Sequence, residues 1–240
     1  MPRRSYAHYC AIARSLDVLG ERWTLLIIRE LLAGPRRYTE LHADLPGIST
    51  DILATRLKEM EADGLLERHR TGPPAPAWVY ELTPRGRDLL PILHALAGWG
   101  TELLDGREPT DAVRSHWLAL PIARLLRQAF PGHEGIIEVR VDGARWYLQL
   151  GPGEPVPAYE GPAEPGVVLT LSTETMVDLV GAQITLAEAL AGGHLKVQGS
   201  SLVDALRATR PRHTPPPDNT FPAPAAAAGN LAHHSRRFAT

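Results

Sequence analysis

The chain has 240 residues, and its 25 Lys and Arg against 27 Asp and Glu leave a formal net charge of −2 at pH 7. No run of about 18 apolar residues is present, which argues against a membrane span. The N-terminal MPRRSYAHYC lacks the apolar core of a secretory signal, and a single cysteine excludes an internal disulfide framework, so we expect a cytoplasmic protein. Because bulk charge does not favour nucleic acid, DNA-binding groups would have to gather on one surface.

Helical periodicity dominates the first part of the chain. Apolar residues recur at three- and four-residue steps and predict one amphipathic helix that ends at Gly34-Pro35; they are Leu16, Leu19, Trp23, Leu26 and Ile27. A short helix is expected over residues 39–45. Ser49 is a suitable N-cap for a third helix over residues 50–63, within the stretch GISTDILATRLKEMEADG.

After this helix the pattern changes to strands. Residues 65–70 and 78–82 are rich in strand-forming residues, and the proline-rich loop 71–77 between them is too long for a tight hairpin. Thr83-Pro84 then begins another helix, whose apolar stripe extends to Leu103. The order helix, helix, helix, hairpin, helix is typical of a winged helix-turn-helix unit.

The second half of the chain predicts a mixed α/β unit. A helix over 111–130, kinked at Pro121, precedes a hairpin over 135–150 with an Asp142-Gly143 turn. The further expected elements are a strand at 167–171, helices at 173–181 and 184–191, a strand at 195–198 and a last helix from Ser201. Residues 211–240 are rich in Pro, Ala and His with little periodicity, so we expect a disordered tail.

The first half resembles the HxlR-type winged helix-turn-helix transcriptional regulators. The resemblance rests on ordered motifs, namely LGERWTLLIIREL (19–31), GPRRYTEL (34–41), LPGIS (45–49), RLKEM (56–60), DGLLER (63–68) and VYELTPRG (79–86). It implies a dimeric regulator that binds an inverted-repeat operator in double-stranded DNA. The helix over residues 50–63 would then be the recognition helix, rather than a plain core helix with a solvated face.

The N-terminal half of a recognition helix enters the major groove. Ile52, Leu53, Leu57 and Met60 are expected to face the core, which leaves four residues as candidates for base contacts: Thr50, Asp51, Thr55 and Lys58. Further DNA-binding candidates, several of them basic groups suited to phosphates, are Arg36, Arg37, Thr39, Ser49, Arg56, Arg68 and Arg70. The family often has a basic residue where this chain has Asp51, which either accepts from a cytosine N4 or favours the helix dipole.

The apolar stripe of the following helix predicts a dimer interface, with packing inside one subunit as the alternative. Its members are Leu89, Leu93, Leu96, Trp99 and Leu103. Cys10 lies near a position where the family often has cysteine, in some members a redox sensor. A buried and inert thiol is favoured over a sensor, because no activating environment is visible in the sequence.

The second half resembles the sterol carrier protein 2 domain, through VDGARWYL (141–148), VLTLS (168–172) and ALAGGHLKVQG (189–199). This resemblance implies an apolar tunnel for a lipid-like molecule. The candidate pocket residues are Trp146, Leu148, Leu171, Met176, Leu179 and Val180, although an ordinary core would use the same residue types.

The predicted fold class is α+β, with a winged helix-turn-helix domain followed by an α/β sterol carrier protein 2-like domain. The predicted divisions are an N-terminal arm (1–8), a DNA-binding and dimerisation domain (9–105), a ligand-binding domain (106–210) and the tail (211–240). We expect a regulator controlled by an apolar small molecule. The alternatives are a lipid carrier whose helical half only dimerises it, and a C-terminal domain that only supports dimerisation. Since no catalytic motif or metal-ligand spacing is present, we expect no catalytic residues, metal or cofactor.

Overall fold

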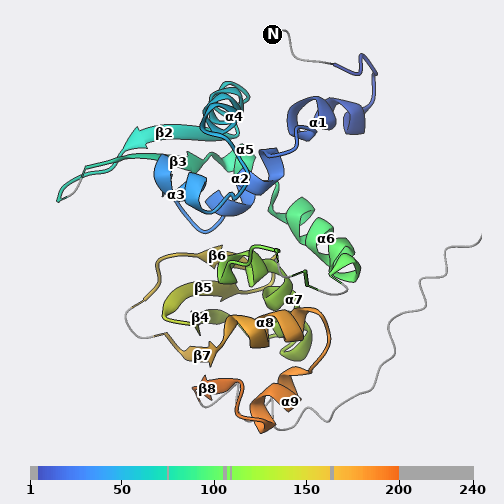
Figure 1. Cartoon of the computed structure of the whole chain (residues 1–240), viewed down its shortest axis with the longest axis vertical. Helices are drawn as coiled ribbons and strands as arrows, with labels where there is room; N and C mark the ends of the chain where they lie inside the picture. The colour runs from blue at the N-terminus through green and yellow to red at the C-terminus, as the bar shows by residue number, and fades with distance from the viewer. Residues whose placement is uncertain (1–4, 75, 105–106, 109, 163–164, 200–240) are drawn as a thin grey trace, which may run out of the picture.

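A computed structural model describes residues 5–74, 76–104, 107–108, 110–162 and 165–199. The fold is α+β, and its elements form two units (Figure 1). The N-terminal unit contains α1 (Ala11–Leu19), α2 (Thr24–Leu31), β1 (Arg36–Arg37), α3 (Tyr38–Ala43), α4 (Thr50–Ala62), β2 (Leu66–Arg70), β3 (Trp78–Leu82), α5 (Pro84–Arg87), α6 (Leu90–Gly100) and the 3₁₀ turn η1 (Thr101–Leu103). The C-terminal unit contains the 3₁₀ turn η2 (Ser115–Leu118), α7 (Ala119–Ala129), β4 (Gly135–Val141), β5 (Ala144–Leu150), β6 (Val156–Ala158), β7 (Val167–Leu171), α8 (Thr173–Val180), α9 (Leu186–Ala191) and β8 (Lys196–Gln198).

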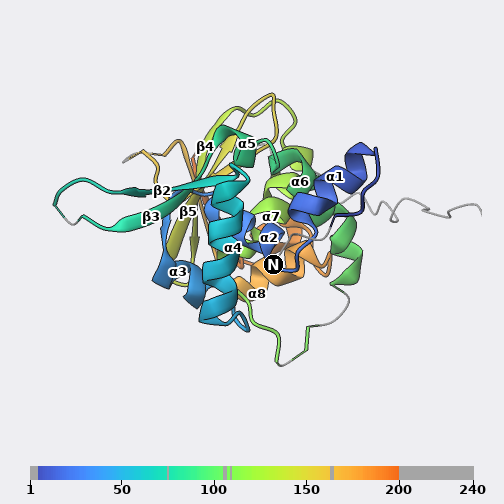
Figure 2. The same ribbon diagram turned by 90° about the horizontal axis from the view of Figure 1, so that it is seen from above.

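The N-terminal unit is a winged helix-turn-helix. Helices α3 and α4 lie in the sequence between β1 and the β2–β3 hairpin, and the three strands form an antiparallel sheet in the order β1-β3-β2. The hairpin projects from one side as the wing (Figures 1 and 2). The hairpin register pairs Leu66 with Leu82 and Arg70 with Trp78. Helix α4 lies on the side of this unit that faces away from the C-terminal unit (Figure 1).

The prediction that Leu16 to Ile27 lie on one helix ending at Gly34-Pro35 is wrong, because the chain forms α1 and α2 with a turn between them. The N–H of Gly20 donates to the Leu16 carbonyl at 2.8 Å and closes α1. A Cβ at Gly20 would lie only 2.5 Å from that same carbonyl oxygen. The two helices also differ in burial, since α1 buries only Ala13 whereas α2 buries most of its length.

The helix predicted from Thr83-Pro84 is likewise two helices, α5 and α6. Thr83 caps α5 as expected, accepting from the Gly86 N–H at 3.2 Å. Pro91 lies in the first turn of α6 and has no N–H to donate to the Arg87 carbonyl, so one continuous helix is interrupted there.

The C-terminal unit is a five-stranded sheet in the order β6-β5-β4-β7-β8, with α7, α8 and α9 packed against it (Figure 1). All strand pairs are antiparallel except β4 and β7. The predicted helix 111–130 is shorter than expected, because η2 and α7 begin only at Ser115 and Ala119. Pro121 then lies in the first turn of α7, where its missing N–H costs no hydrogen bond and causes no kink.

Each unit has its own hydrophobic core, and one residue crosses between them. The C-terminal core joins α7, the sheet, α8 and α9. The N-terminal core joins α2, α3, α4 and the sheet, and it also includes Leu120, which belongs to α7. None of the helices in the described part of the chain combines the length and apolar character needed to cross a lipid bilayer. The expected last helix from Ser201 and the tail 211–240 lie outside the described residues.

Candidate DNA-binding surface and the polar junction beside it

Helix α4 is capped as its sequence predicts. The Ser49 hydroxyl accepts from the Ile52 N–H at 3.2 Å, and Gly64 follows the last turn with φ of +70°. Leu53 and Leu57 are buried in the N-terminal core, which fixes the opposite side of the helix towards solvent. Ile52 was expected to face the core, but it is 45% exposed, because the buried side of α4 is narrower than the apolar pattern suggested.

The four predicted base-contact residues, Thr50, Asp51, Thr55 and Lys58, are all exposed on α4. Asp51 lies in the first turn, where the helix dipole stabilises a carboxylate by about 0.3–1 kcal/mol. This placement is compatible with either role proposed for Asp51, and its contact with a base stays a prediction. The exposed N-terminal half of α4 is thus available to a major groove.

Arg56 does not extend towards solvent. Its Nη2 lies 2.6 Å from Glu59 Oε2, its Nη1 lies 4.0 Å from Glu21 Oε2, and its side chain is only 15% exposed. A guanidinium held this way is not presented to a phosphate. The expected phosphate contact of Arg56 is therefore not supported by the geometry.

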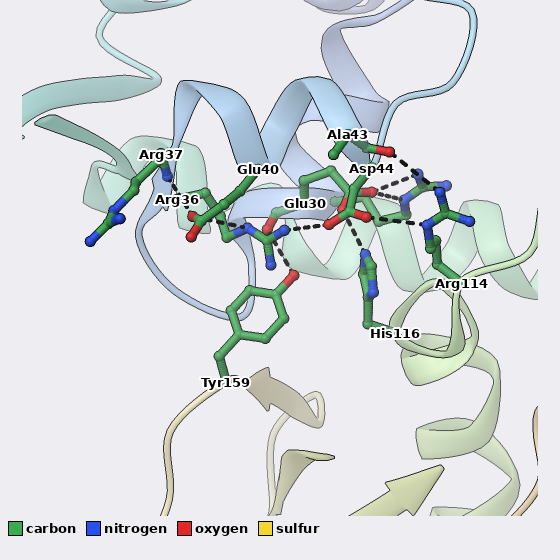
Figure 3. Close-up of polar contacts among 10 residues, drawn as sticks. Glu30, Arg36, Arg37, Glu40, Ala43, Asp44, Arg114, His116 and Tyr159 are labelled. Carbon is green, nitrogen blue, oxygen red and sulfur yellow. Dashed lines mark hydrogen bonds and ion pairs between the residues drawn. The ribbon is translucent and has the colours of Figure 1, made fainter. Parts of the chain in front are cut away.

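The two arginines before α3 point in different directions (Figure 3). Arg37 is exposed, as is Thr39 in the first turn of α3, so both remain available to DNA. Arg36 instead pairs with Asp44, and its guanidinium lies 4.6 Å from the centroid of the Tyr159 ring. The prediction that Arg36 lies on the DNA face is wrong, because this side chain is used within the chain.

Cations also stand at the base of the wing. Arg68 is exposed, with its guanidinium 4.6 Å from the Trp78 ring centroid and 5.9 Å from that of Tyr80. Burial raises the pKa of the Tyr80 phenol, which keeps this ring neutral beside the arginine. Arg70 is exposed two residues further along β2. Stacking on aromatic rings orients Arg68 without neutralising it, so it keeps its charge for a phosphate.

Some residues of the predicted dimer stripe pack inside the subunit, and others are exposed as a dimer interface would require. Leu93 is only 6% exposed and belongs to the N-terminal core, against which Leu89 also packs. Leu96, Trp99 and Leu103 are exposed, with Trp99 at 68%. Helices α1 and α6 lie on one side of the molecule in both views (Figures 1 and 2). Exposed large apolar side chains on these helices or directly beside them are Tyr9, Ile12, Leu16, Ile92, Leu96, Trp99, Leu103 and Leu104.

The six predicted pocket residues all pack into the C-terminal core, which agrees with the alternative that they belong to an ordinary core. They are Trp146, Leu148, Leu171, Met176, Leu179 and Val180. Trp146 also borders a cavity of about 10 Å³ where the two units meet, which is room for about one water molecule.

Cys10 differs from the favoured buried thiol, because it is exposed just before α1.

A buried carboxylate joins the two units. Glu30, near the end of α2, is fully buried, and its Oε2 lies 2.7 Å from His116 Nε2 of η2 (Figure 3). Arg29 donates to the other oxygen from Nη2 at 2.6 Å and from Nε at 2.9 Å. The same Arg29 guanidinium lies 4.4 Å from the Trp117 ring centroid. Both carboxylate oxygens are therefore paired, one of them by the C-terminal unit.

A second carboxylate, Asp44, ends α3 and is held from both units. Arg36 pairs with its Oδ2, and Arg114 Nε donates to its Oδ1 at 3.2 Å. Arg114 Nη2 also donates to the Ala43 carbonyl at 3.4 Å (Figure 3). Arg114 thus binds the C-terminal end of α3 from the segment that leads into the C-terminal unit.

Tyr159 completes the contact. Its hydroxyl donates to the Glu30 carbonyl at 3.3 Å, and its N–H donates to the Ala33 carbonyl at 2.8 Å. Burial raises the pKa of the Tyr159 phenol well above its usual range, so the hydroxyl stays protonated and can donate. We call these six residues the polar junction: Glu30, Arg36, Asp44, Arg114, His116 and Tyr159.

The polar junction does not fit a metal ion. Glu30, Asp44 and His116 lie close enough to share one. Their carboxylate oxygens, however, already pair with three guanidinium groups, and a further cation among those charges would be repelled. The site therefore has the character of an internal ion-pair network.

Comparison with known proteins identifies the N-terminal unit. Residues 18–108 match the HxlR-like helix-turn-helix family. The chain is 40% identical over 93 residues to the uncharacterised HTH-type transcriptional regulator YvaP of Bacillus subtilis (strain 168), an alignment that covers 38% of this chain and 85% of YvaP. The chain belongs to the HxlR-like helix-turn-helix family. It is thus a transcriptional regulator of the helix-turn-helix type.

A second relative is also named an HTH-type transcriptional regulator. The regulator sll1512 of Synechocystis sp. (strain ATCC 27184 / PCC 6803 / Kazusa) is 38% identical over 98 residues, 41% of this chain and 73% of its own length. A crystal structure described as a MarR-family transcriptional regulator from Porphyromonas gingivalis W83 is 34% identical and covers 42% of this chain and 98% of its own, with a TM-score of 0.38. Residues 118–208 match the SCP-2 sterol transfer family, so this HxlR-like protein carries a second, different domain.

The residues of the polar junction escaped prediction from the sequence, apart from Arg36. His116 lies 86 residues from Glu30, and Tyr159 lies 129 residues from it, so no local pattern links them. One signal was present in Thr24–Leu31, where Glu30 is the single acid of a mostly apolar helix. A fully buried acid needs a partner, which would have justified a search for one.

Proposed function

We propose that this protein binds an inverted-repeat operator as a homodimer and that its C-terminal unit adjusts that binding in response to an apolar small molecule. The observation that carries the proposal is the exposed N-terminal half of α4, with Thr50, Asp51, Thr55 and Lys58 on its outer side. Arg37 lies before α3, and Arg68 and Arg70 lie on the wing. Such cations neutralise phosphates on either side of the groove.

The exposed apolar surface on α1 and α6 supports the homodimer. An apolar surface that includes a tryptophan and several leucines is typical of a protein interface. In a two-fold dimer, the recognition helices would reach two half-sites about one DNA turn apart. We propose residues 9–105 as the DNA-binding and dimerisation domain and 106–210 as the ligand-binding domain.

The match to the SCP-2 sterol transfer family supports an apolar ligand for the C-terminal unit. Because the predicted pocket residues fill the core, a ligand would have to open that core on binding. A lipid extract or an apolar library should then raise the thermal midpoint of the full chain. If no compound shifts it, the C-terminal unit serves dimerisation alone.

Sequencing the DNA that the full chain selects from its genome tests the operator. The variant Thr50→Ala/Thr55→Ala/Lys58→Ala should bind the selected site at least about a hundredfold more weakly, since each base contact contributes about 1–3 kcal/mol. Its binding to random DNA should fall much less. Lys196→Ala removes an equivalent exposed charge from β8 and should leave both affinities unchanged. Operator affinity that ignores the α4 changes would refute this recognition surface, and failure to select any sequence would favour the carrier alternative.

A further inference from the structure

The polar junction makes contacts near both ends of α3. Arg36 lies in β1, two residues before α3, with its guanidinium over the ring of Tyr159, and Asp44 caps the end of α3 and pairs with Arg114 (Figure 3). Tyr159 and Arg114 both come from outside the helix-turn-helix. Helix α3 is therefore positioned by the C-terminal side of the molecule as well as by its own domain.

Helix α3 is in turn bonded to the start of α4. The Tyr38 hydroxyl, from the first residue of α3, donates to the Thr50 carbonyl at 2.8 Å. Thr50 is the first residue of α4 and one of the residues proposed to read bases. A displacement of α3 would therefore be passed to the end of α4 that enters the groove.

Most groups of the polar junction are sheltered from water, whereas the Arg114 side chain at its edge is 42% exposed. The Arg36 and Asp44 side chains are 14% and 18% exposed, and Glu30 is fully buried. Pairs of this kind are screened by salt much less than surface pairs. The ion pairs of Arg36, Asp44 and Glu30 can therefore hold the position of α3 relative to the C-terminal unit.

The residues that the C-terminal side contributes to the polar junction are connected along the chain to the sheet and core of that unit. Tyr159 directly follows β6, a three-residue strand that lies at the edge of the sheet formed by the described residues and pairs there with β5. Arg114 and His116 lie in the segment that leads into α7, and α7 is part of the C-terminal core. A change in that core would reach Tyr159 and Arg114 before it reached the helix-turn-helix.

We propose that the polar junction is the route by which the C-terminal unit sets operator affinity, with Arg114 and Tyr159 as positioning residues for α3. The inference rests on the proposed function, and it names the contacts that carry regulation within it. The intact polar junction holds α3 and α4 ready for the groove. Loss of one contact leaves α3 and α4 less ordered. DNA binding must then restore that order, which lowers the affinity for DNA.

Arg114→Gln in the full chain tests the proposal, because it removes the contact with Asp44 and leaves the core untouched. Affinity for the selected operator should fall about fivefold or more, the lower end of usual couplings between sites. The slope of log affinity against log salt should stay unchanged, since Arg114 is not a phosphate contact. Arg145→Gln removes the same charge from an exposed position on β5 and should change neither quantity. Unchanged operator affinity, or a slope reduced by about one, would overturn the proposal.

Hydrogen exchange without DNA separates this inference from the proposed function. In Arg114→Gln and in Tyr159→Leu, which removes the ring beneath Arg36, the amides of α3 should exchange faster than in the wild type, while those of α9 should not change. If the wild-type chain binds no DNA, the proposed function fails, whereas α3 exchange still shows whether the polar junction positions that helix. Unaltered α3 exchange in both variants overturns the inference even if the operator is bound.

Discussion

Replacing Glu30 with alanine should lower the free energy of unfolding by about 3 kcal/mol, because breaking a buried ion pair from one side typically costs 3–5 kcal/mol. The Glu30 carboxylate is fully buried and pairs with Arg29 and His116. Its removal leaves the half-buried Arg29 without a counter-charge, and it disconnects His116 from α2. Urea unfolding of the full chain measures the change.

Two further variants show whether the charge or the lost volume is responsible. Glu134→Ala removes an exposed acid before β4 and should change the unfolding free energy by no more than about 0.5 kcal/mol. Glu30→Met/His116→Leu fills the same space without charge and should recover part of the loss. If Glu30→Ala unfolds like Glu134→Ala, the carboxylate does not hold the two units together.

Trp99→Asp should weaken the homodimer at least about thirtyfold, since a tryptophan at the centre of an interface commonly contributes 2 kcal/mol or more. Trp99 is 68% exposed and lies among the other exposed apolar residues of α6. Because the side chain is not part of the monomer core, the fold should be preserved. Sedimentation at a series of concentrations gives the dissociation constant, and operator affinity should fall with it.

Ala191→Asp serves as the control for Trp99→Asp, because it adds the same charge at an exposed position on α9, in the other unit. It should leave both dimerisation and operator affinity unchanged. A Trp99→Asp protein that sediments as the wild type does would place the dimer contact elsewhere. A wild-type chain that is monomeric at all concentrations would end the dimer proposal.

The winged helix-turn-helix could be predicted from the sequence because its signals are local. The Ser49 cap, the glycine after α4 and the two strands of the wing each depend on neighbours within a few residues, and all three are present in the structure. The turn between α1 and α2 could not be predicted in the same way. Apolar residues continue across Gly20 in helical steps, and only their burial in the fold separates the two helices.

The direction of individual side chains was the least predictable feature. Arg36 and Arg37 are adjacent and chemically identical, yet one contacts Tyr159 and the other faces solvent. Arg56 has a basic side chain on a recognition helix, yet a neighbouring glutamate binds it. Each outcome depends on a partner that folding brings close, and Tyr159 lies more than a hundred residues from Arg36 along the chain.

Leu120 couples the stability of one unit to that of the other. It belongs to α7 of the C-terminal unit, but its side chain is part of the N-terminal core. If either unit unfolded alone, it would remove a buried leucine from its neighbour and break the polar junction as well. We therefore expect the chain to unfold as one cooperative unit rather than as two independent domains. By mass action, whatever binds the native form of one half stabilises the other half too.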